Sequence, residues 1–238
     1  MSPRRNTDIQ NKSLWRVSYV VTRLLGRIIG KRCLLSFLLD LSWLSRRLAF
    51  EQSCKIVGGD TLLSCSALSK NQFEKEVTSG SSLLDIGCGS GRWVDIGIKH
   101  GVDIVGIDSD IHSITTCQAK FPRAKFFHGT LEDYLVANPN AKFDFVLLSH
   151  LLEHIEDPEL LLERITLISR HVLIEVPDFD SDPLNHIRVL FNRPFYTDND
   201  HKYEFQIEEL LYILNKVGIK VKTVLKKGGM IFVHGTIA

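Results

Sequence analysis

From Ser81 to Pro177 the chain alternates short β-rich runs with helical patterns, and this alternation limits the possible folds more than any other feature. Five runs read as strands: SLLDI, DIVGI, AKFF, FDFVLL and HVLIEV. Helical patterns follow the first, second and fourth of these runs. Strands that alternate with helices predict a parallel sheet joined by crossover helices.

Two more β-rich runs flank Lys227, Gly228 and Gly229 near the end of the chain. A turn of this composition predicts an antiparallel pair of strands, and a helical pattern over residues 207–217 precedes it. The expected fold is therefore an α/β sheet of seven strands, mostly parallel, with an antiparallel C-terminal strand and helices on both faces.

The first 50 residues differ from the rest in charge. They carry ten Lys or Arg against Asp8 and Asp40, whereas the remaining residues carry 19 basic and 26 acidic side chains. Such a division indicates a separate segment, and a Gly-Gly pair at residues 58 and 59 ends its helical pattern. We expect a helical N-terminal extension over residues 1–58 and an α/β domain over residues 59–238.

The extension reads as two helices. From Leu14 to Ile29 the apolar residues recur at helical spacing on one side while the basic residues gather on the other, and a second helical pattern covers residues 34–48. Three roles stay open for these helices. The helices could form a lid on the α/β domain, mediate a homodimer contact, or make a peripheral contact with anionic lipid on the inner face of a membrane.

Cysteine usage and hydropathy indicate a cytoplasmic protein. The five cysteines are odd in number and form no C-x-x-C pair, which argues against a disulfide framework and a structural zinc site. No stretch has the basic start, apolar run and small-residue cleavage site of a signal peptide. The longest uncharged stretch before Asp40, CLLSFLL, is too short to span a bilayer.

A glycine loop joins the first strand to its helix. In LLDIGCGSGRW, residues 83–93, three glycines lie between the β-rich run and the helical pattern. Glycines at this junction allow a tight turn and a close approach of the backbone to a ligand, and the helix start offers N–H groups. The spacing G-x-G-x-G is one residue shorter than the dinucleotide pattern G-x-G-x-x-G.

Two carboxylates accompany the loop. Asp85 precedes the first glycine, where it can attract an ammonium group, and Asp108 ends the second strand 23 residues later. A carboxylate at the second position accepts hydrogen bonds from both hydroxyls of a ribose. The expected ligand is a nucleoside that carries a positive amino group. Taken singly, Asp85 is equally compatible with a turn aspartate, and Asp108 with a solvated strand-end residue.

The segments LLDIGCGSGRW, GIDSD, FHGTLEDY and FDFVLLSHLLEHIEDPELLLERI resemble those of class I S-adenosylmethionine-dependent methyltransferases of the small-molecule group, in order and in approximate spacing. The resemblance covers residues 81–177 and the C-terminal part in outline. It implies a Rossmann-like fold, S-adenosyl-L-methionine as the cofactor and methyl transfer as the activity. The competing hypotheses are a non-catalytic cofactor-binding scaffold and an NAD-binding Rossmann oxidoreductase.

The resemblance also implies a cofactor site. Asp85 and the loop glycines would hold the methionine part, and Asp108 the ribose. Ser109 and the Thr130-Leu131 pair would contact the adenine. Many family members have an aspartate where this chain has Thr130, and Glu132 or Asp133 is the alternative there. The predicted cofactor-binding residues are Asp85, Gly87, Cys88, Gly89, Gly91, Asp108, Ser109, Thr130, Leu131, Ser149 and His150.

The motif SHLLEH, residues 149–154, contains H-x-x-E-H, a pattern of inverted zinc peptidases. It begins where a strand ends rather than within a helix, and it matches the S-x-x-L-E-H segment of methyltransferases better. Ser149 and His150 are then expected beside the methionine part and the transferring methyl group, whereas Glu153 and His154 brace the loop. We predict no metal site, either here or in the acidic loop DFDSDP.

Methyl transfer requires a dry pocket and an acceptor aligned with the methyl group. A hydroxyl acceptor gains from a base, and histidine suits that role near neutral pH. His150 and His201 are the catalytic candidates, and the alternatives are a buried, hydrogen-bonded His150 and an exposed His201. The acidic α/β domain argues against a nucleic-acid partner. We expect O-methylation of a small acceptor, such as a sugar-containing molecule or a lipid-linked glycan.

Overall fold

The computed structural model describes residues 12–57, 67–196, 198 and 200–237. The chain divides into two compact units. The first unit reaches Glu51 and includes Leu184–Phe195, and the second unit holds Gln52–Pro183 and Tyr196–Ala238. The domain boundary expected at residue 58 lies outside the described residues and stays a prediction.

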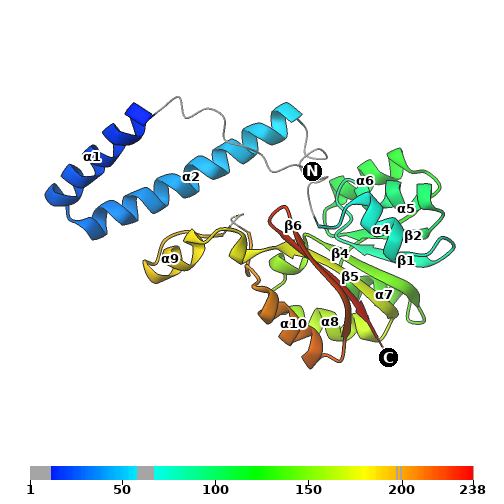
Figure 1. The fold of residues 1–238 in the computed structure, drawn as a ribbon. Helices are drawn as coiled ribbons and strands as arrows, with labels where there is room; N and C mark the ends of the chain where they lie inside the picture. Colours follow the sequence, from blue (N-terminus) through cyan, green and yellow to red (C-terminus); the bar gives the residue numbers. More distant parts are fainter. Residues whose placement is uncertain (1–11, 58–66, 197, 199, 238) are drawn as a thin grey trace. The chain divides into compact units, whose positions relative to one another are not determined.

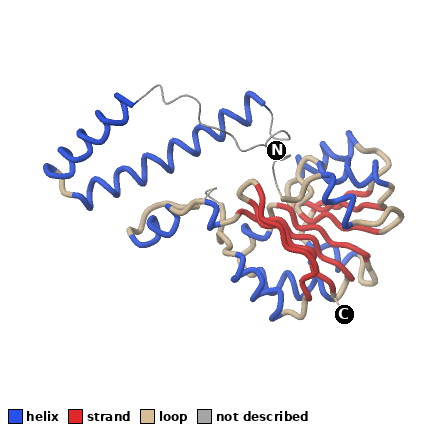
Figure 2. The backbone as a smooth tube through the Cα atoms, in the orientation of Figure 1, coloured by secondary structure: helices blue, strands red, loops and turns tan. Residues whose placement is uncertain are grey.

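A seven-stranded sheet forms the centre of the second unit (Figures 1 and 2), with the order β3-β2-β1-β4-β5-β7-β6. Neighbours from β3 to β5 are parallel, whereas β7 runs antiparallel to both β5 and β6. This arrangement confirms the expected fold. The strands are β1 (Ser82–Ile86), β2 (Asp103–Asp108), β3 (Lys125–His128), β4 (Phe143–Ser149), β5 (Ser169–Pro177), β6 (Lys220–Lys227) and β7 (Met230–Thr236).

Helices cover both faces of this sheet (Figure 1). Along β1, Leu83 packs into a core with side chains of α4, α5 and α6, and its neighbour Leu84 packs into a second core with α7, α8 and α10. The alternation follows from the strand pleat, which directs successive side chains to opposite faces. The helices are α4 (Lys70–Glu76), α5 (Arg92–His100), α6 (Ile111–Lys120), α7 (Leu131–Ala137), α8 (Pro158–Thr166) and α10 (Ile207–Lys216).

In the described part of the chain, three short α-helices add to those expected from the sequence: α4, α7 and α9 (Leu184–Leu190). Helix α7 has only seven residues, and its first turn is held by a reciprocal cap. Thr130 Oγ1 accepts a hydrogen bond from the Asp133 N–H, and the Asp133 carboxylate accepts one from the Thr130 N–H. A helix of this length is too short to show a periodic pattern, so its cap is the signal that could have revealed it.

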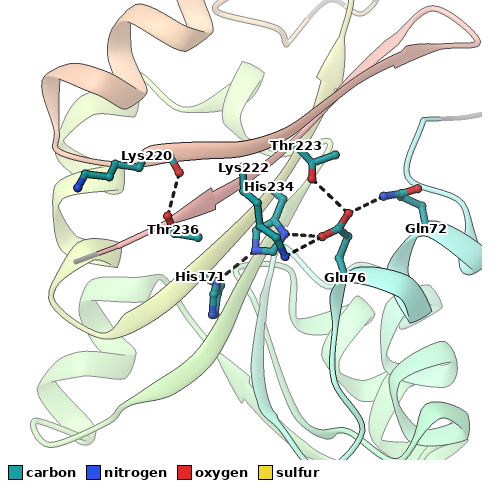
Figure 3. Close-up of polar contacts among 8 residues, drawn as sticks. All are labelled: Gln72, Glu76, His171, Lys220, Lys222, Thr223, His234 and Thr236. Carbon is teal, nitrogen blue, oxygen red and sulfur yellow. Dashed lines mark hydrogen bonds and ion pairs between the residues drawn. The ribbon is translucent and has the colours of Figure 1, made fainter.

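Hydrogen bonds of the Glu76 side chain connect helix α4 to the sheet (Figure 3). Its carboxylate accepts a hydrogen bond of 2.6 Å from His234 Nδ1 on β7 and one of 2.8 Å from Gln72 Nε2. His234 Nε2 in turn lies 3.1 Å from His171 Nδ1 on β5. The network therefore joins the helix that precedes the first strand to two strands of the opposite half of the sheet.

The first unit contains α1 (Lys12–Ile28), most of α2 (Lys31–Val57) and α9. Arg188 on α9 is buried and donates a hydrogen bond of 2.8 Å to Ser42 Oγ on α2. Arg193, just beyond α9, forms an ion pair with Asp40 of α2. The two N-terminal helices expected from the sequence are present, and the segment around α9 packs on the second. Every helix in the described part of the chain falls short of the length or apolarity needed to cross a bilayer.

Candidate functional site

The glycine loop lies at the carboxyl end of β1 and leads into α5. Gly87, Gly89 and Gly91 have φ angles of 72°, 50° and 79°, in the left-handed region that other residues rarely adopt. At Gly91 an added Cβ would also lie 2.7 Å from the Phe121 ring and 2.9 Å from Cys117 Sγ. The path of the loop therefore requires glycine at this position.

Asp85 lies next to the last residue of β1 and is 1% exposed. Its Oδ2 atom is buried and has no hydrogen-bond partner among the described residues. Burial, and to a smaller extent the charge of Asp108, raises the pKa of Asp85 to about 7. A buried carboxyl group with an unused oxygen suits a cationic group of a ligand, because that charge would stabilise the ionised form.

Asp108 ends β2, and main-chain donors fix its carboxylate. The Gly89 N–H donates to Oδ2 and the Asp110 N–H donates to Oδ1, each at 2.8 Å. The side chain thus bridges the glycine loop and the turn after β2. Because a carboxylate oxygen accepts more than one hydrogen bond, both oxygens retain capacity for the two hydroxyls of a ribose.

A pocket of about 870 Å³ opens at the carboxyl ends of the parallel strands. Its volume lies in the upper part of the range for small-molecule sites. Four apolar residues that are not among the predicted site residues form part of its wall: Leu151, Ile155, Leu160 and Leu161. Six of the predicted cofactor-binding residues also line it: Gly87, Asp108, Ser109, Thr130, Leu131 and His150.

The other predicted cofactor-binding residues, Asp85, Cys88, Gly89, Gly91 and Ser149, are not among the residues that line this pocket. Cys88 is 6% exposed, and burial raises the pKa of its thiol, so the side chain is an inert packing group. Ser149 is half-buried at the end of β4. Gly89 acts through its N–H on Asp108. The roles of these five residues stay predictions.

Thr130 and Leu131 begin α7 at the pocket wall. The Thr130 hydroxyl accepts from the Asp133 N–H and donates to the Asp133 carboxylate at 2.9 Å. Because Asp133 caps the helix in return, neither side chain is well placed to contact an adenine edge. Leu131 is 3% exposed, and Glu132 lines the pocket beside it. Of the two acidic alternatives to Thr130, the pocket therefore favours Glu132.

His150 follows β4 and has a φ of 55°, an unusual value for a residue with a side chain. Its Nδ1 lies 3.5 Å from Glu153 Oε1, and its Nε2 lies 3.7 Å from Glu175 Oε2. Burial opposes the charged ring, but the two carboxylates outweigh it and raise the pKa of His150. A protonated imidazole donates hydrogen bonds. The two nearby carboxylates therefore favour His150 as a hydrogen-bond donor over His150 as a general base.

His201, the second catalytic candidate, is buried rather than exposed: its side chain is 7% exposed and its Nδ1 lies 2.9 Å from Glu204 Oε1. It does not line the pocket, whereas its neighbours Asp200 and Lys202 do. Its ring lies edge-on to that of His154, with centroids 4.6 Å apart. The structure thus brings His201 to the end of the SHLLEH motif, 47 residues away in the sequence.

Comparison with known proteins identifies related sequences. A family model described as a methyltransferase domain matches residues 62–224. The chain is 30% identical over 83 residues to a ubiquinone biosynthesis O-methyltransferase of Aliivibrio fischeri. This match covers 33% of this chain and 35% of that protein. It is also 25% identical over 150 residues to a probable S-adenosylmethionine-dependent methyltransferase of Mycolicibacterium smegmatis. That match covers 62% of this chain and 55% of that protein. The matches thus span from about a third to just over half of these relatives.

Solved structures share the fold. A SAM dependent methyltransferase from Aquifex aeolicus superposes with a TM-score of 0.57 and 16% identity, over 79% of this chain and 98% of that protein. This likeness independently supports the sheet order and the two layers of helices described above.

Proposed function

Since the chain belongs to the family of class I S-adenosylmethionine-dependent methyltransferases, we propose that it transfers a methyl group from this cofactor to a hydroxyl oxygen of a small acceptor. One observation carries the proposal. Asp108 from the end of β2 and His150 from the end of β4 line the same pocket. Carboxyl ends of parallel strands are where open α/β sheets bind their ligands.

The residues at this end of the sheet fit the cofactor. Asp85 offers a buried carboxylate oxygen for the amino group of the methionine part, and the glycine loop leaves room for close approach. Asp108 is held in position to receive the ribose hydroxyls. The cofactor, when bound, supplies an electrophilic methyl group on a positively charged sulfur.

The pocket wall supports transfer to oxygen. Leu151, Ile155, Leu160 and Leu161 provide an apolar surface that excludes water from the methyl group. His150 offers a hydrogen-bond donor that can orient an acceptor oxygen. Some relatives are named ubiquinone biosynthesis O-methyltransferases, and this name supports oxygen as the acceptor atom.

The test is a transfer assay with full-length protein, cofactor labelled in its methyl group, and a panel of hydroxylated small molecules that includes phenols, free sugars and lipid-linked sugars. We expect label in an alkali-stable methyl ether, and none with the Asp108→Ala variant. Cofactor binding without transfer to any member would support the scaffold hypothesis instead.

We further propose that the acceptor is lipid-linked and that the first unit rests on an anionic membrane surface. Helix α1 contains four basic residues and no acidic residue. Its described basic side chains are exposed, and so are the apolar side chains Val17, Val21, Leu24 and Ile28, the last at 77%. Apolar and basic side chains exposed on one helix suit the boundary between lipid chains and anionic headgroups.

Vesicle sedimentation tests this proposal. Full-length protein is expected to sediment with vesicles that contain phosphatidylglycerol, less so in high salt, and not with neutral vesicles. The substitutions Leu24→Glu and Ile28→Glu should abolish sedimentation without affecting cofactor binding. A dimer in solution that is lost in these variants, together with no vesicle binding, would instead assign the helices to a homodimer contact.

A further inference from the structure

Glu153, His154 and His201 form a cluster at the edge of the pocket. One potential ligand atom from each residue lies within 4.8 Å of those from the other two. From this cluster we propose that the protein binds a divalent transition-metal cation through these three side chains. Binding itself does not depend on the proposed function, but the catalytic role given below does.

The backbone fixes the cluster. Glu153 and His154 lie on a short 3-10 helix, η1 (Leu152–His154), that follows β4. The Glu153 carbonyl accepts hydrogen bonds from the N–H groups of Lys202 at 2.8 Å and Tyr203 at 3.1 Å. His201 directly precedes these two donors, so the same bonds hold its main chain against η1. Ligands on fixed backbone segments lose little freedom when they bind a cation.

The Glu153 side chain is an independent observation that points to a cation. It is 0% exposed, and neither carboxylate oxygen has a hydrogen-bond partner among the described residues. The ring of His150 lies 3.5 Å from Oε1, which is within ion-pair distance but beyond a good hydrogen bond. A buried carboxylate left without such bonds is costly. A bound cation would remove this cost by direct coordination.

A carboxylate lies beside each histidine, as around many metal sites, and the one beside His201 is hydrogen-bonded to its ring. His201 Nδ1 lies 2.9 Å from Glu204 Oε1, and the Glu204 side chain is 2% exposed. His154 Nδ1 lies 3.3 Å from Asp200 Oδ2. A ring that donates through Nδ1 carries its lone pair on Nε2, which is the form that binds metals. The Glu204 carboxylate, as the acceptor, also increases the electron density on the His201 ring.

The ligand set identifies the class of metal. Two imidazoles and one carboxylate suit zinc, iron, cobalt or manganese better than calcium, which prefers oxygen ligands alone. Three protein ligands leave further coordination positions for water or substrate. His154 lines the pocket, so those positions adjoin the space where the acceptor binds.

The location gives the cation a role that rests on the proposed function. A cation at the acceptor end of the pocket would coordinate an acceptor hydroxyl and lower its pKa, so that the oxygen loses its proton before it attacks the methyl group. The proton leaves to water, and no oxidant or reductant is required. An acceptor with two neighbouring oxygens would occupy two coordination positions and would be preferred over a lone alcohol.

The competing explanation is a structural cluster in which Glu153 pairs with protonated histidines. Untagged full-length protein, stripped with a chelator and dialysed, is titrated with Zn²⁺ by calorimetry and with Co²⁺ by absorption spectroscopy. We expect one Zn²⁺ per chain with micromolar or tighter affinity, and ligand-field bands for Co²⁺. Glu153→Gln and His201→Gln should weaken binding at least about ten-fold.

Two exposed residues outside the cluster provide matched controls. Glu163→Gln and His112→Gln should bind Zn²⁺ as the wild type does. The His154 side chain is 29% exposed, so the His154→Gln variant is expected to fold. It therefore tests the metal site even if a substitution at a buried residue of the cluster prevents folding. No Zn²⁺ binding by stripped wild type, or equal binding by the cluster variants, would overturn the metal site. Cofactor binding measured with chelator present reports on the proposed function separately.

Discussion

His234 Nδ1 donates a hydrogen bond of 2.6 Å to Glu76 Oε2 and thereby connects β7 to α4. Both residues are buried, at 1% and 8% exposed. Burial opposes the charge of Glu76, but the bond from His234 and the nearby Lys222 outweigh it and lower the pKa of that carboxyl. Burial lowers the pKa of His234 more than Glu76 raises it. The pair is therefore an ionised carboxylate and a neutral imidazole.

This pair should make the fold sensitive to acid. Each lowered pKa means that the unfolded state binds more protons, so the free energy of unfolding falls as pH falls through the ordinary range of histidine and then of glutamate. We predict a loss of thermal stability between pH 7.5 and 4.5. The His234→Gln variant should be less stable at pH 7.5 and should lose less stability on acidification.

Thermal unfolding monitored by circular dichroism measures both effects. The exposed His112→Gln variant is the control and should follow the wild-type profile. Parallel pH profiles of the wild type and His234→Gln would contradict the assigned protonation states.

Asp85 should have the opposite effect on the pH dependence of stability. Its pKa of about 7 in the folded protein exceeds the ordinary value of 3.8 for aspartate. The folded state therefore binds more protons, and this residue reduces stability as pH rises from 4 to 7. Asp85→Asn should therefore stabilise the free protein at pH 8, by about 1–3 kcal/mol, while it weakens cofactor binding.

The same residue should make cofactor binding depend on pH. If the ionised carboxylate contacts the amino group of the cofactor, affinity rises between pH 6 and 8, and binding at pH 6 releases protons. Calorimetry in buffers of different ionisation enthalpy counts these protons. Proton release that persists in Asp85→Asn would assign it to another group.

Gly91→Ala should test the strain in the glycine loop. The added Cβ meets Phe121 and Cys117, and the φ of 79° is unfavourable for alanine. We expect a loss of about 2–4 kcal/mol in the free energy of unfolding. Gly80→Ala separates the two contributions, because Gly80 has a φ of 86° with nothing within 4 Å of an added Cβ. It should cost only about 1–2 kcal/mol, and an equal loss in both variants would rule out the steric contribution.

The sheet was predictable because each strand carries its own signal. The runs SLLDI, DIVGI and FDFVLL are apolar and bounded by turn residues, so local pattern and strand order together indicate a parallel sheet. The turn at Lys227 likewise indicated the C-terminal pair. The short helix α7 was missed, since seven residues show no period.

Contacts between distant segments were not predictable in the same way. The hydrogen bonds from Lys202 and Tyr203 to the Glu153 carbonyl involve main-chain atoms of a polar loop, which leave no trace in side-chain pattern. For this reason the sequence indicates His201 only as a catalytic candidate, with an exposed histidine as the alternative, and does not indicate its burial beside Glu153. The packing of Arg188 on Ser42 is another example, because α9 follows the α/β pattern in sequence yet packs against α2.

Titration of the full-length protein with S-adenosylhomocysteine, the demethylated cofactor, tests the central claim most directly. We predict one site per chain, with affinity reduced at least about ten-fold in Asp108→Ala. Asp103→Ala, at the exposed opposite end of β2, should bind as the wild type does. Absence of binding by folded wild type, or equal affinity in Asp108→Ala, would contradict the assignment of this pocket to the cofactor.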